Sequence, residues 1–323
     1  MSASPAAAAS PARVLVTCPP MLGQIAAFHG PAAALGLELV PAQVTQIMTE
    51  PELIAALPEY DGWIIGDDPA TAAVFEAARA GRLRAAVKWG IGVDNVDFAA
   101  CGRLGIPIVN TPGMFGAEVA DVALGYVIGL ARHLFEIDSG VRAGGWPKPA
   151  GISLAGRRAV VAGLGDIGRS VAARLMALGM EVTACDPGVQ GDAGLPGLSR
   201  AAWPEGLEQA DIVVLTCALT ASSRHMVNAE TLARMKPGVR LVNVARGPLI
   251  DEPALVAALR AGHVHSAALD VFETEPLPMD SPLRTLPCVL GTHNGSNTVD
   301  AVHRASGEAM ERLAGFLQET APA

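Results

Sequence analysis

Short apolar runs alternate along the chain with longer stretches in which apolar residues recur every three or four positions. The short runs are rich in valine, isoleucine and alanine and predict strands, while the longer stretches predict amphipathic helices. Strands are predicted at residues 13–17, 62–65, 85–88, 106–109, 159–162, 181–185, 212–215, 240–243 and 266–269. Helices are predicted between them, for example at 71–80, 95–103, 167–178 and 253–260. This alternation is typical of parallel sheets built from βαβ units, so we expect an α/β protein.

One predicted helix differs from the others. Between Glu118 and Arg132, the run 122–131 is apolar on every face of the helix. A helix that is apolar all round must be covered on more than one side. Two interpretations follow: a central helix inside one domain, or a helix that also meets a second subunit.

Composition narrows the class of protein. A chain of 323 residues is long enough for two domains. Half of its residues are hydrophobic and only 17% are charged, which excludes a disordered chain. It has 23 Lys and Arg against 32 Asp and Glu, a net charge of −9, with no basic cluster. We therefore expect neither nucleic acid nor an anionic membrane surface as a partner.

The cysteines and the N-terminal residues indicate the cellular compartment in which the protein is expected. The five cysteines form no C-x-x-C pair, so we expect free thiols in a reducing compartment and no zinc site. Residues 1–12 lack the basic start and compact apolar run of a signal peptide, and we expect a short disordered tail there. Prolines and glycines interrupt the uncharged stretch 14–37, which argues against a membrane span. A cytoplasmic protein is expected.

A glycine-rich motif, GLGDIG, occupies residues 163–168. It follows one predicted strand and precedes a predicted helix, which is the context of a dinucleotide-binding loop. The first glycine permits the tight turn, the second lets the backbone approach a pyrophosphate, and the third allows close packing of helix and strand. The pyrophosphate then lies at the helix N-terminus. The loop residues expected to contact the cofactor are Gly163, Gly165, Asp166, Ile167 and Gly168.

Asp186 follows the next predicted strand, 181–185. A carboxylate in this place accepts hydrogen bonds from the ribose hydroxyls, and it would repel a 2′-phosphate. The cofactor is therefore predicted to be NAD in preference to NADP. The alternative is a solvated strand end before Pro187.

These motifs, together with several others, resemble those of the D-isomer-specific 2-hydroxyacid dehydrogenase family. The matching stretches are KWGIGVDNVD at 88–97, NTPG at 110–113, the glycine motif, NVARG at 243–247, ALDVFETEP at 268–276 and GTH at 291–293. The first two are most similar to 3-phosphoglycerate dehydrogenases. The resemblance implies a member of that group that lacks the C-terminal regulatory domain of the longer members.

The resemblance implies two doubly wound parallel-sheet domains. A Rossmann NAD-binding domain of residues 112–294 would be inserted into a flavodoxin-like substrate-binding domain of residues 13–111 and 295–323. It also implies a homodimer, with the apolar helix 122–131 at a two-fold interface.

The implied activity is hydride transfer between NAD and a D-2-hydroxy acid or its 2-oxo acid. By resemblance, Arg246 holds the substrate carboxylate and polarises the carbonyl. His293 is the acid in reduction and the base in oxidation, and Glu275 bonds its other ring nitrogen. No metal is expected to take part.

Further cofactor contacts follow from the same resemblance. Asp270 is expected to face the nicotinamide amide, or alternatively to cap the end of a strand. Cys217 and Val244 are expected to line the cofactor side of the cleft. Asp166 departs from the family, which often has an arginine at this place in the loop.

The substrate is expected to contact a second glycine loop. The backbone N–H groups of Ile91, Gly92 and Val93 would hold its carboxylate. Lys88, at the carboxyl end of a predicted strand, would meet a second anionic group: a phosphate ester, a phosphonate or a carboxylate. The alternative for Lys88 is a solvated side chain.

Two other functions share these features. An NADH-sensing, corepressor-like binding protein has the same fold and the same three catalytic residue types. A glyoxylate or hydroxypyruvate reductase would differ in its substrate. Turnover of NADH with a panel of 2-oxo acids discriminates among the three.

Overall fold

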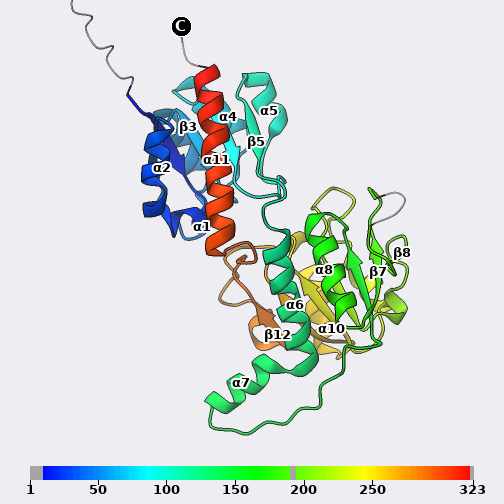
Figure 1. Cartoon of the computed structure of the whole chain (residues 1–323). Helices are drawn as coiled ribbons and strands as arrows, with labels where there is room; N and C mark the ends of the chain where they lie inside the picture. The colour runs from blue at the N-terminus through cyan, green and yellow to red at the C-terminus, as the bar shows by residue number, and fades with distance from the viewer. Residues whose placement is uncertain (1–9, 190–193, 321–323) are drawn as a thin grey trace, which may run out of the picture. The chain divides into compact units, whose positions relative to one another are not determined.

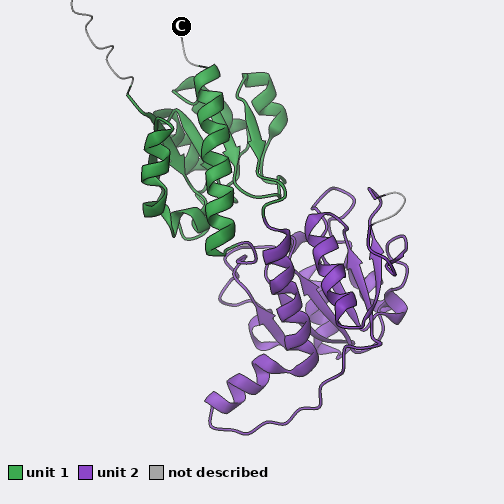
Figure 2. Ribbon diagram, viewed as in Figure 1, with its two compact units in different colours: residues 1–114, 297–323 green, residues 115–296 purple. Residues whose placement is uncertain are grey.

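The computed structural model describes residues 10–189 and 194–320. The chain forms two compact units, unit 1 from residues 1–114 and 297–323 and unit 2 from residues 115–296 (Figure 2). Unit 2 is therefore an insertion in the sequence of unit 1. Its bounds, 115 and 296, differ by two or three residues from the expected 112 and 294.

In the described part of unit 1, the strands form a parallel sheet in the order β2-β1-β3-β4-β5 (Figure 1). Its strands are β1 (Ala12–Val16), β2 (Leu37–Pro41), β3 (Gly62–Ile65), β4 (Ala85–Lys88) and β5 (Ile108–Asn110). This is the flavodoxin-like order, whose connections change direction between β1 and β3. Such a change of direction opens a crevice at the carboxyl ends of these two strands.

Helices cover both faces of this sheet. Trp63 and Ile65 of β3 point into a core with Phe75, and helices on that face are α3 (Glu50–Ala56), α4 (Ala72–Ala80) and α5 (Phe98–Leu104). The C-terminal helix α11 (Val299–Glu319) packs on β3 and β4 from the other face, beside α1 (Pro19–Leu22). The short helix α2 (His29–Ala34) packs on the edge strand β2.

In the described part of unit 2, a second parallel sheet has the order β12-β11-β10-β9-β6-β7-β8. Its strands are β6 (Arg158–Ala162), β7 (Glu181–Cys185), β8 (Ser199–Arg200), β9 (Ile212–Leu215), β10 (Val239–Asn243), β11 (Val264–Leu269) and β12 (Cys288–Leu290). Numbered from β6, this is the Rossmann order, and it reverses between β6 and β9. Both sheets therefore confirm the predicted fold class.

The helices of unit 2 also cover both faces of its sheet (Figure 1). The covering helices are α6 (Gly116–Arg132), α8 (Asp166–Ala177), α9 (Ala229–Arg234) and α10 (Glu252–Arg260), and α7 (Leu134–Arg142) follows α6. Helix α6 packs against α8 and strands β10 and β11. Helix α7 extends away from this sheet (Figure 1). The segment after it returns to unit 2, where the N–H of Ile152 donates to the carbonyl of Ala131 at 2.9 Å. Short 3-10 turns lie at Ile25–Ala27, Leu57–Glu59, Leu207–Gln209, Gly247–Leu249 and Pro282–Thr285.

Side-chain caps fix where several helices begin. Thr71, Asp97, Asp251 and Thr298 each precede a helix and accept the backbone N–H of the third residue along, in α4, α5, α10 and α11. Such a cap satisfies one of the helix's orphan donors and contributes about 1 kcal/mol.

The structure adds elements that the hydrophobic pattern did not predict. Strands β2, β8 and β12 were missed: β2 ends in Pro41, which an edge strand tolerates, while β8 and β12 are too short to show a period. Residues 1–9 of the expected tail lie outside the described residues, and Ala12 already belongs to β1. Helix α6, which contains the apolar run 122–131, is not fully covered within this chain. Gly125 is exposed, and Val122 and Ile128 are half-buried.

Candidate active site

The glycine loop follows β6 at the point where the order of the second sheet reverses. Gly163 has a φ of 98°, and a Cβ there would lie 2.6 Å from the Cα of Cys217, which follows β9. A Cβ on Gly168 would lie 2.1 Å from the carbonyl oxygen of Gly163. Both positions therefore require glycine for packing alone. Gly165 is different: a Cβ there would meet nothing within 4 Å.

The open space at Gly165 lies at the N-terminus of α8, whose first residue is Asp166. The free N–H groups of this helix end favour an anion, and the absence of a side chain at Gly165 lets a phosphate approach the backbone. Asp166 lies against α6, because a Cβ on Gly116 would come within 2.5 Å of its carboxylate. Ile167 is half-buried in the first turn. The loop therefore fits a dinucleotide, with Asp166 as an acidic neighbour of the phosphate position.

Asp186 closes this loop from the end of β7. Its Oδ2 accepts the N–H of Leu164 at 2.6 Å, and its Oδ1 accepts the N–H of Gly188 at 2.8 Å. The carboxylate is therefore held against the glycine loop rather than pointing freely into solvent, as the alternative interpretation had it. A carboxylate oxygen has two lone pairs, so each can still accept a hydroxyl donor.

His293 lies in the loop after β12 in a left-handed conformation, with a φ of 55°. Its Nδ1 lies 2.8 Å from Oε2 of Glu275, and both side chains are about one-fifth exposed. The other oxygen of Glu275, Oε1, accepts the N–H of Phe272 at 2.9 Å. Because the carboxylate is fixed at both oxygens, it holds the proton on Nδ1 and makes Nε2 the ring nitrogen that can exchange a proton. This hydrogen bond is the one expected from the sequence.

Asp270 holds the loop that carries His293. It is buried at the end of β11, and its Oδ2 accepts the N–H of Gly295 at 2.8 Å. Its Oδ1 accepts weaker bonds from the N–H of Asn294, at 3.3 Å, and from the hydroxyl of Tyr126, at 3.4 Å. These contacts are those of a strand-end cap, the alternative considered for this residue; a contact with the nicotinamide stays a prediction. The sequence did not indicate Tyr126, whose pKa is raised by burial and by the charge of Asp270.

Arg246 lies in the turn after β10 and is half-buried. Asn243 shapes this turn, because its Nδ2 donates to the carbonyl of Arg246 at 2.9 Å and its Oδ1 accepts the N–H of Ala245 at 3.0 Å. A Cβ on Gly247 would lie 1.8 Å from the carbonyl carbon of Phe272. Glycine at 247 therefore lets the Arg246 turn pack directly on the segment that leads to Glu275.

The remaining cofactor candidates line the same edge of the sheet in unit 2. Val244 is buried directly after β10. Cys217 is half-buried after β9, and burial raises its pKa to about 11, so it stays a neutral thiol. The residues predicted from the glycine motif thus follow the carboxyl end of a strand of this sheet or begin the next helix. The predicted catalytic residues, Arg246, Glu275 and His293, also lie in segments that follow strands of this sheet. In open α/β sheets, ligands bind at this edge.

The predicted substrate residues belong to unit 1. Lys88 is not solvated, which corrects the alternative interpretation: it is 2% exposed, and its Nζ donates to the carbonyl of Gly66 at 2.6 Å and to Oδ1 of Asp67 at 3.1 Å. In the loop after it, Ile91 and Val93 are exposed. Within the described residues, no acceptor receives the backbone N–H groups at 91–93, so they can bind a carboxylate.

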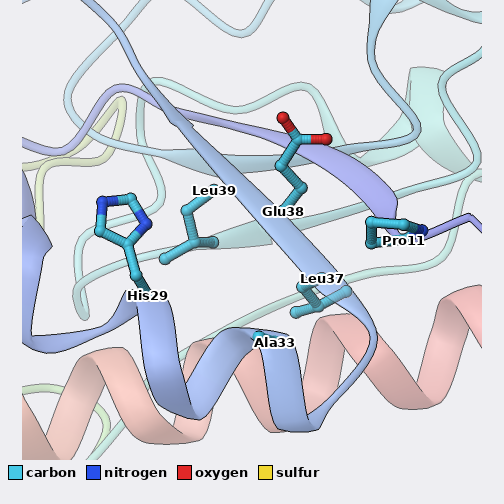
Figure 3. A pocket seen from close by; sticks show the side chains of 6 residues that line it. All are labelled: Pro11, His29, Ala33, Leu37, Glu38 and Leu39. Atoms are coloured by element: carbon cyan, nitrogen blue, oxygen red, sulfur yellow. The ribbon is translucent and has the colours of Figure 1, made fainter.

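Three further observations concern features outside the predicted site residues. A shallow hollow at the edge strand β2 contains none of the predicted residues; it is lined by Pro11, His29, Ala33, Leu37, Glu38 and Leu39 (Figure 3). Among residues 10–189 and 194–320, His, Cys, Asp and Glu side chains form no group of three placed to hold a metal ion. The described helices include none long and apolar enough to cross a membrane.

Comparison with known proteins identifies the family. Residues 124–295 match the family described as "D-isomer specific 2-hydroxyacid dehydrogenase, NAD binding domain", which confirms NAD as the predicted cofactor. A D-3-phosphoglycerate dehydrogenase of Arabidopsis thaliana is 38% identical over 84% of this chain, which spans 46% of that protein. A hydroxypyruvate reductase of Thermotoga maritima is 36% identical over 81% of this chain and 86% of its own length.

A solved structure, that of the TT0316 protein from Thermus thermophilus, has the same fold. It superposes with a TM-score of 0.83 and 32% identity, covering 96% of this chain and 98% of its own. The agreement of sequence and structure over nearly the whole chain leads to one conclusion. The chain belongs to the D-isomer-specific 2-hydroxyacid dehydrogenase family.

Proposed function

We propose that the protein reduces a small 2-oxo acid to the D-2-hydroxy acid with NADH, and catalyses the reverse oxidation with NAD. The hydrogen bond of 2.8 Å between His293 and Glu275 carries this proposal. A histidine whose Nδ1 is bound by a carboxylate is oriented to give and take a proton at Nε2, as carbonyl reduction requires. The names of the relatives in Arabidopsis and Thermotoga support the same reaction class.

Three side chains have separate roles in the proposed reaction. His293 gives its Nε2 proton to the carbonyl oxygen during reduction, and Glu275 stabilises the imidazolium that precedes this transfer. Arg246 places a guanidinium beside the carbonyl oxygen and the substrate carboxylate, where it stabilises the developing negative charge. The nicotinamide cofactor, when bound, would supply the hydride as NADH in reduction and accept it as NAD in oxidation.

Unit 2 would hold the cofactor. The loop 163–168 and the N-terminus of α8 would bind the pyrophosphate, and Asp186 the ribose hydroxyls. Cys217, Val244 and Asp270 would lie along the cofactor on the same edge of the sheet. Unit 1 would bind the substrate carboxylate through the N–H groups of Ile91, Gly92 and Val93. The second anionic group expected from Lys88 is not part of this proposal, since Asp67 already pairs with that lysine.

A homodimer is part of the proposal. Helix α7 and the segment after it expose large apolar side chains, namely Leu134, Phe135, Val141 and Trp146. Together with the half-exposed face of α6, they form an apolar surface of the kind that a second copy covers. All five cysteines are free thiols, which supports a cytoplasmic location.

Initial rates with NADH and a panel of 2-oxo acids test the function. The panel consists of glyoxylate, pyruvate, hydroxypyruvate, 3-phosphohydroxypyruvate and oxaloacetate, and the configuration of the product is determined by chiral chromatography. Reduction of at least one acid to the D-product supports the proposal. Tight NADH binding without turnover of any of them would instead favour the corepressor-like binding protein.

A further inference from the structure

Lys88 and Asp67 form an ion pair whose members differ in exposure. Lys88 is 2% exposed at the end of β4, while the Asp67 side chain is 32% exposed after β3. A buried ammonium is costly unless a negative charge and hydrogen-bond acceptors surround it. Asp67 at 3.1 Å and the carbonyl of Gly66 at 2.6 Å meet that need. The pair therefore presents a hydrogen-bonding group without net charge.

The pair lies where an open parallel sheet binds ligands. The order β2-β1-β3-β4-β5 changes direction between β1 and β3, and Asp67 closely follows the carboxyl end of β3. The ammonium also lies beside the loop proposed to hold the substrate carboxylate, since a Cβ on Gly90 would be 3.7 Å from Nζ of Lys88. A substrate bound at 91–93 would thus extend its remaining carbons toward this pair.

The turn that carries Asp67 is held in place from several sides. Asp68 accepts the N–H of Gly66 at 3.0 Å, the N–H of Met48 at 2.7 Å and the hydroxyl of Thr17. Asn95 donates to the carbonyls of Gly66 and Asp68, at 3.1 and 2.7 Å. A turn fixed by these hydrogen bonds keeps the Asp67 carboxylate close to Lys88. The positive charge of the lysine is therefore balanced by Asp67 before any substrate binds.

We propose that Asp67 is a specificity-determining residue that restricts the substrate to 2-oxo acids without a second negative charge. This inference rests on the proposed function and names the substrate class within it. A phosphate or second carboxylate near the pair would meet the Asp67 charge, and like charges in contact cost affinity. A neutral hydroxyl on the third carbon can donate to Asp67 and accept from Lys88 Nζ, which has a third N–H beyond its two described acceptors.

Two substitutions with opposite effects test this inference. Asp67→Asn leaves the positive charge of Lys88 and should raise kcat/KM for 3-phosphohydroxypyruvate and oxaloacetate about tenfold or more, mainly through KM. Lys88→Met leaves the negative charge of Asp67 and should lower the same values. Glyoxylate, which has no third carbon, should change less than about threefold in both variants. Glu38→Gln removes an equal charge at the distant edge strand β2 and should alter no substrate ratio.

The wild-type protein provides the first result, and it should prefer hydroxypyruvate to both doubly anionic acids. A wild-type preference for 3-phosphohydroxypyruvate or oxaloacetate would overturn the inference, as would equal changes for all substrates in the variants. If one variant fails to fold, the other still tests the inference, because the direction of its change in kcat/KM for the doubly anionic acids is predicted. If the wild type reduces no 2-oxo acid, the proposed function itself is wrong; if it reduces them without this preference, only the role of Asp67 is wrong.

Discussion

Nδ1 of His293 lies 2.8 Å from Oε2 of Glu275, and the second oxygen of Glu275 is fixed by the N–H of Phe272. The carboxylate thus has one orientation, and through it the imidazole has one as well. A loop that leaves β12 and a segment that leaves β11 are joined at this contact. The geometry of the proposed proton transfer therefore depends on a pair of side chains rather than on His293 alone.

The first prediction concerns this pair. His293→Ala should lower kcat by about 10²–10⁴, because proton transfer to the carbonyl oxygen is lost. Glu275→Gln should retain more activity but move the pH profile of reduction to lower pH, since a neutral amide no longer stabilises the imidazolium. Steady-state rates across pH measure both effects. Near-wild-type turnover by His293→Ala at neutral pH would rule out the proposed role.

Arg246 is predicted to act through the shape of its guanidinium as well as its charge. Arg246→Lys keeps the charge but loses the planar fork that binds a carboxylate through two hydrogen bonds. We expect KM for the 2-oxo acid to rise and kcat to fall, while the Kd of NADH, measured by fluorescence titration, stays the same. An equal loss of NADH affinity would place Arg246 on the cofactor instead.

Sequence patterns predicted the fold well where strands are long and buried. Strands β6 and β9 coincide with the predicted apolar runs 159–162 and 212–215. The glycine motif after β6 predicted a dinucleotide-binding loop there. Strand β12 was missed because three half-buried residues show no period. The resemblance, rather than the spacing of 18 residues, predicted that Glu275 meets His293.

Contacts between distant segments could not be predicted. Tyr126 meets Asp270 across 144 residues, and Asp67 meets Lys88 from the neighbouring strand. The sequence shows Lys88 at a strand end but gives no sign that the neighbouring strand supplies its counter-ion. That counter-ion is the basis of our proposal that the substrate carries no second negative charge.

Asp211 is predicted to make unit 2 sensitive to acid. Burial tends to raise its pKa, but Lys236 at 2.6 Å, the N–H of Arg158 and the nearby Arg157 together bring the pKa below its usual value. A carboxyl whose pKa is lowered by folding stabilises the protein above its unfolded pKa, and this stabilisation is lost as the pH falls through the folded pKa.

Asp211→Asn should therefore lower the free energy of unfolding at pH 7 by about 1–3 kcal/mol. The difference from wild type should shrink as the medium is made acidic, which urea titrations at a series of pH values can measure. Glu181→Gln is a control, because its pair with Arg158 is more than half exposed on both sides and should contribute little. A difference that stays constant down to strong acid would contradict the role of the charge.

The apolar surface of α7 leads to a prediction about assembly. Trp146 is 78% exposed and Val141 is 44% exposed, so substitution of either leaves the core of unit 2 intact. Val141→Glu and Trp146→Glu should each weaken the dimer, since a charge would be buried against an apolar partner. Light scattering at micromolar concentration should give a dimeric mass for wild type and a lower mass for the variants. A monomeric wild type would refute the dimer outright.

Two glycines of the same loop are predicted to fail in different ways when replaced by alanine. Gly165→Ala should leave the melting temperature unchanged, because its Cβ would enter open space and its φ of −72° suits any residue. It should raise the Kd of NADH, since the methyl group would occupy the space through which the pyrophosphate approaches the backbone. Gly163→Ala should instead lower the melting temperature, because its Cβ would lie 2.6 Å from Cys217 at a φ of 98°. Thermal unfolding without cofactor and a fluorescence titration with NADH separate these effects. Unchanged NADH affinity in a fully folded Gly165→Ala variant would show that the cofactor does not cross this loop.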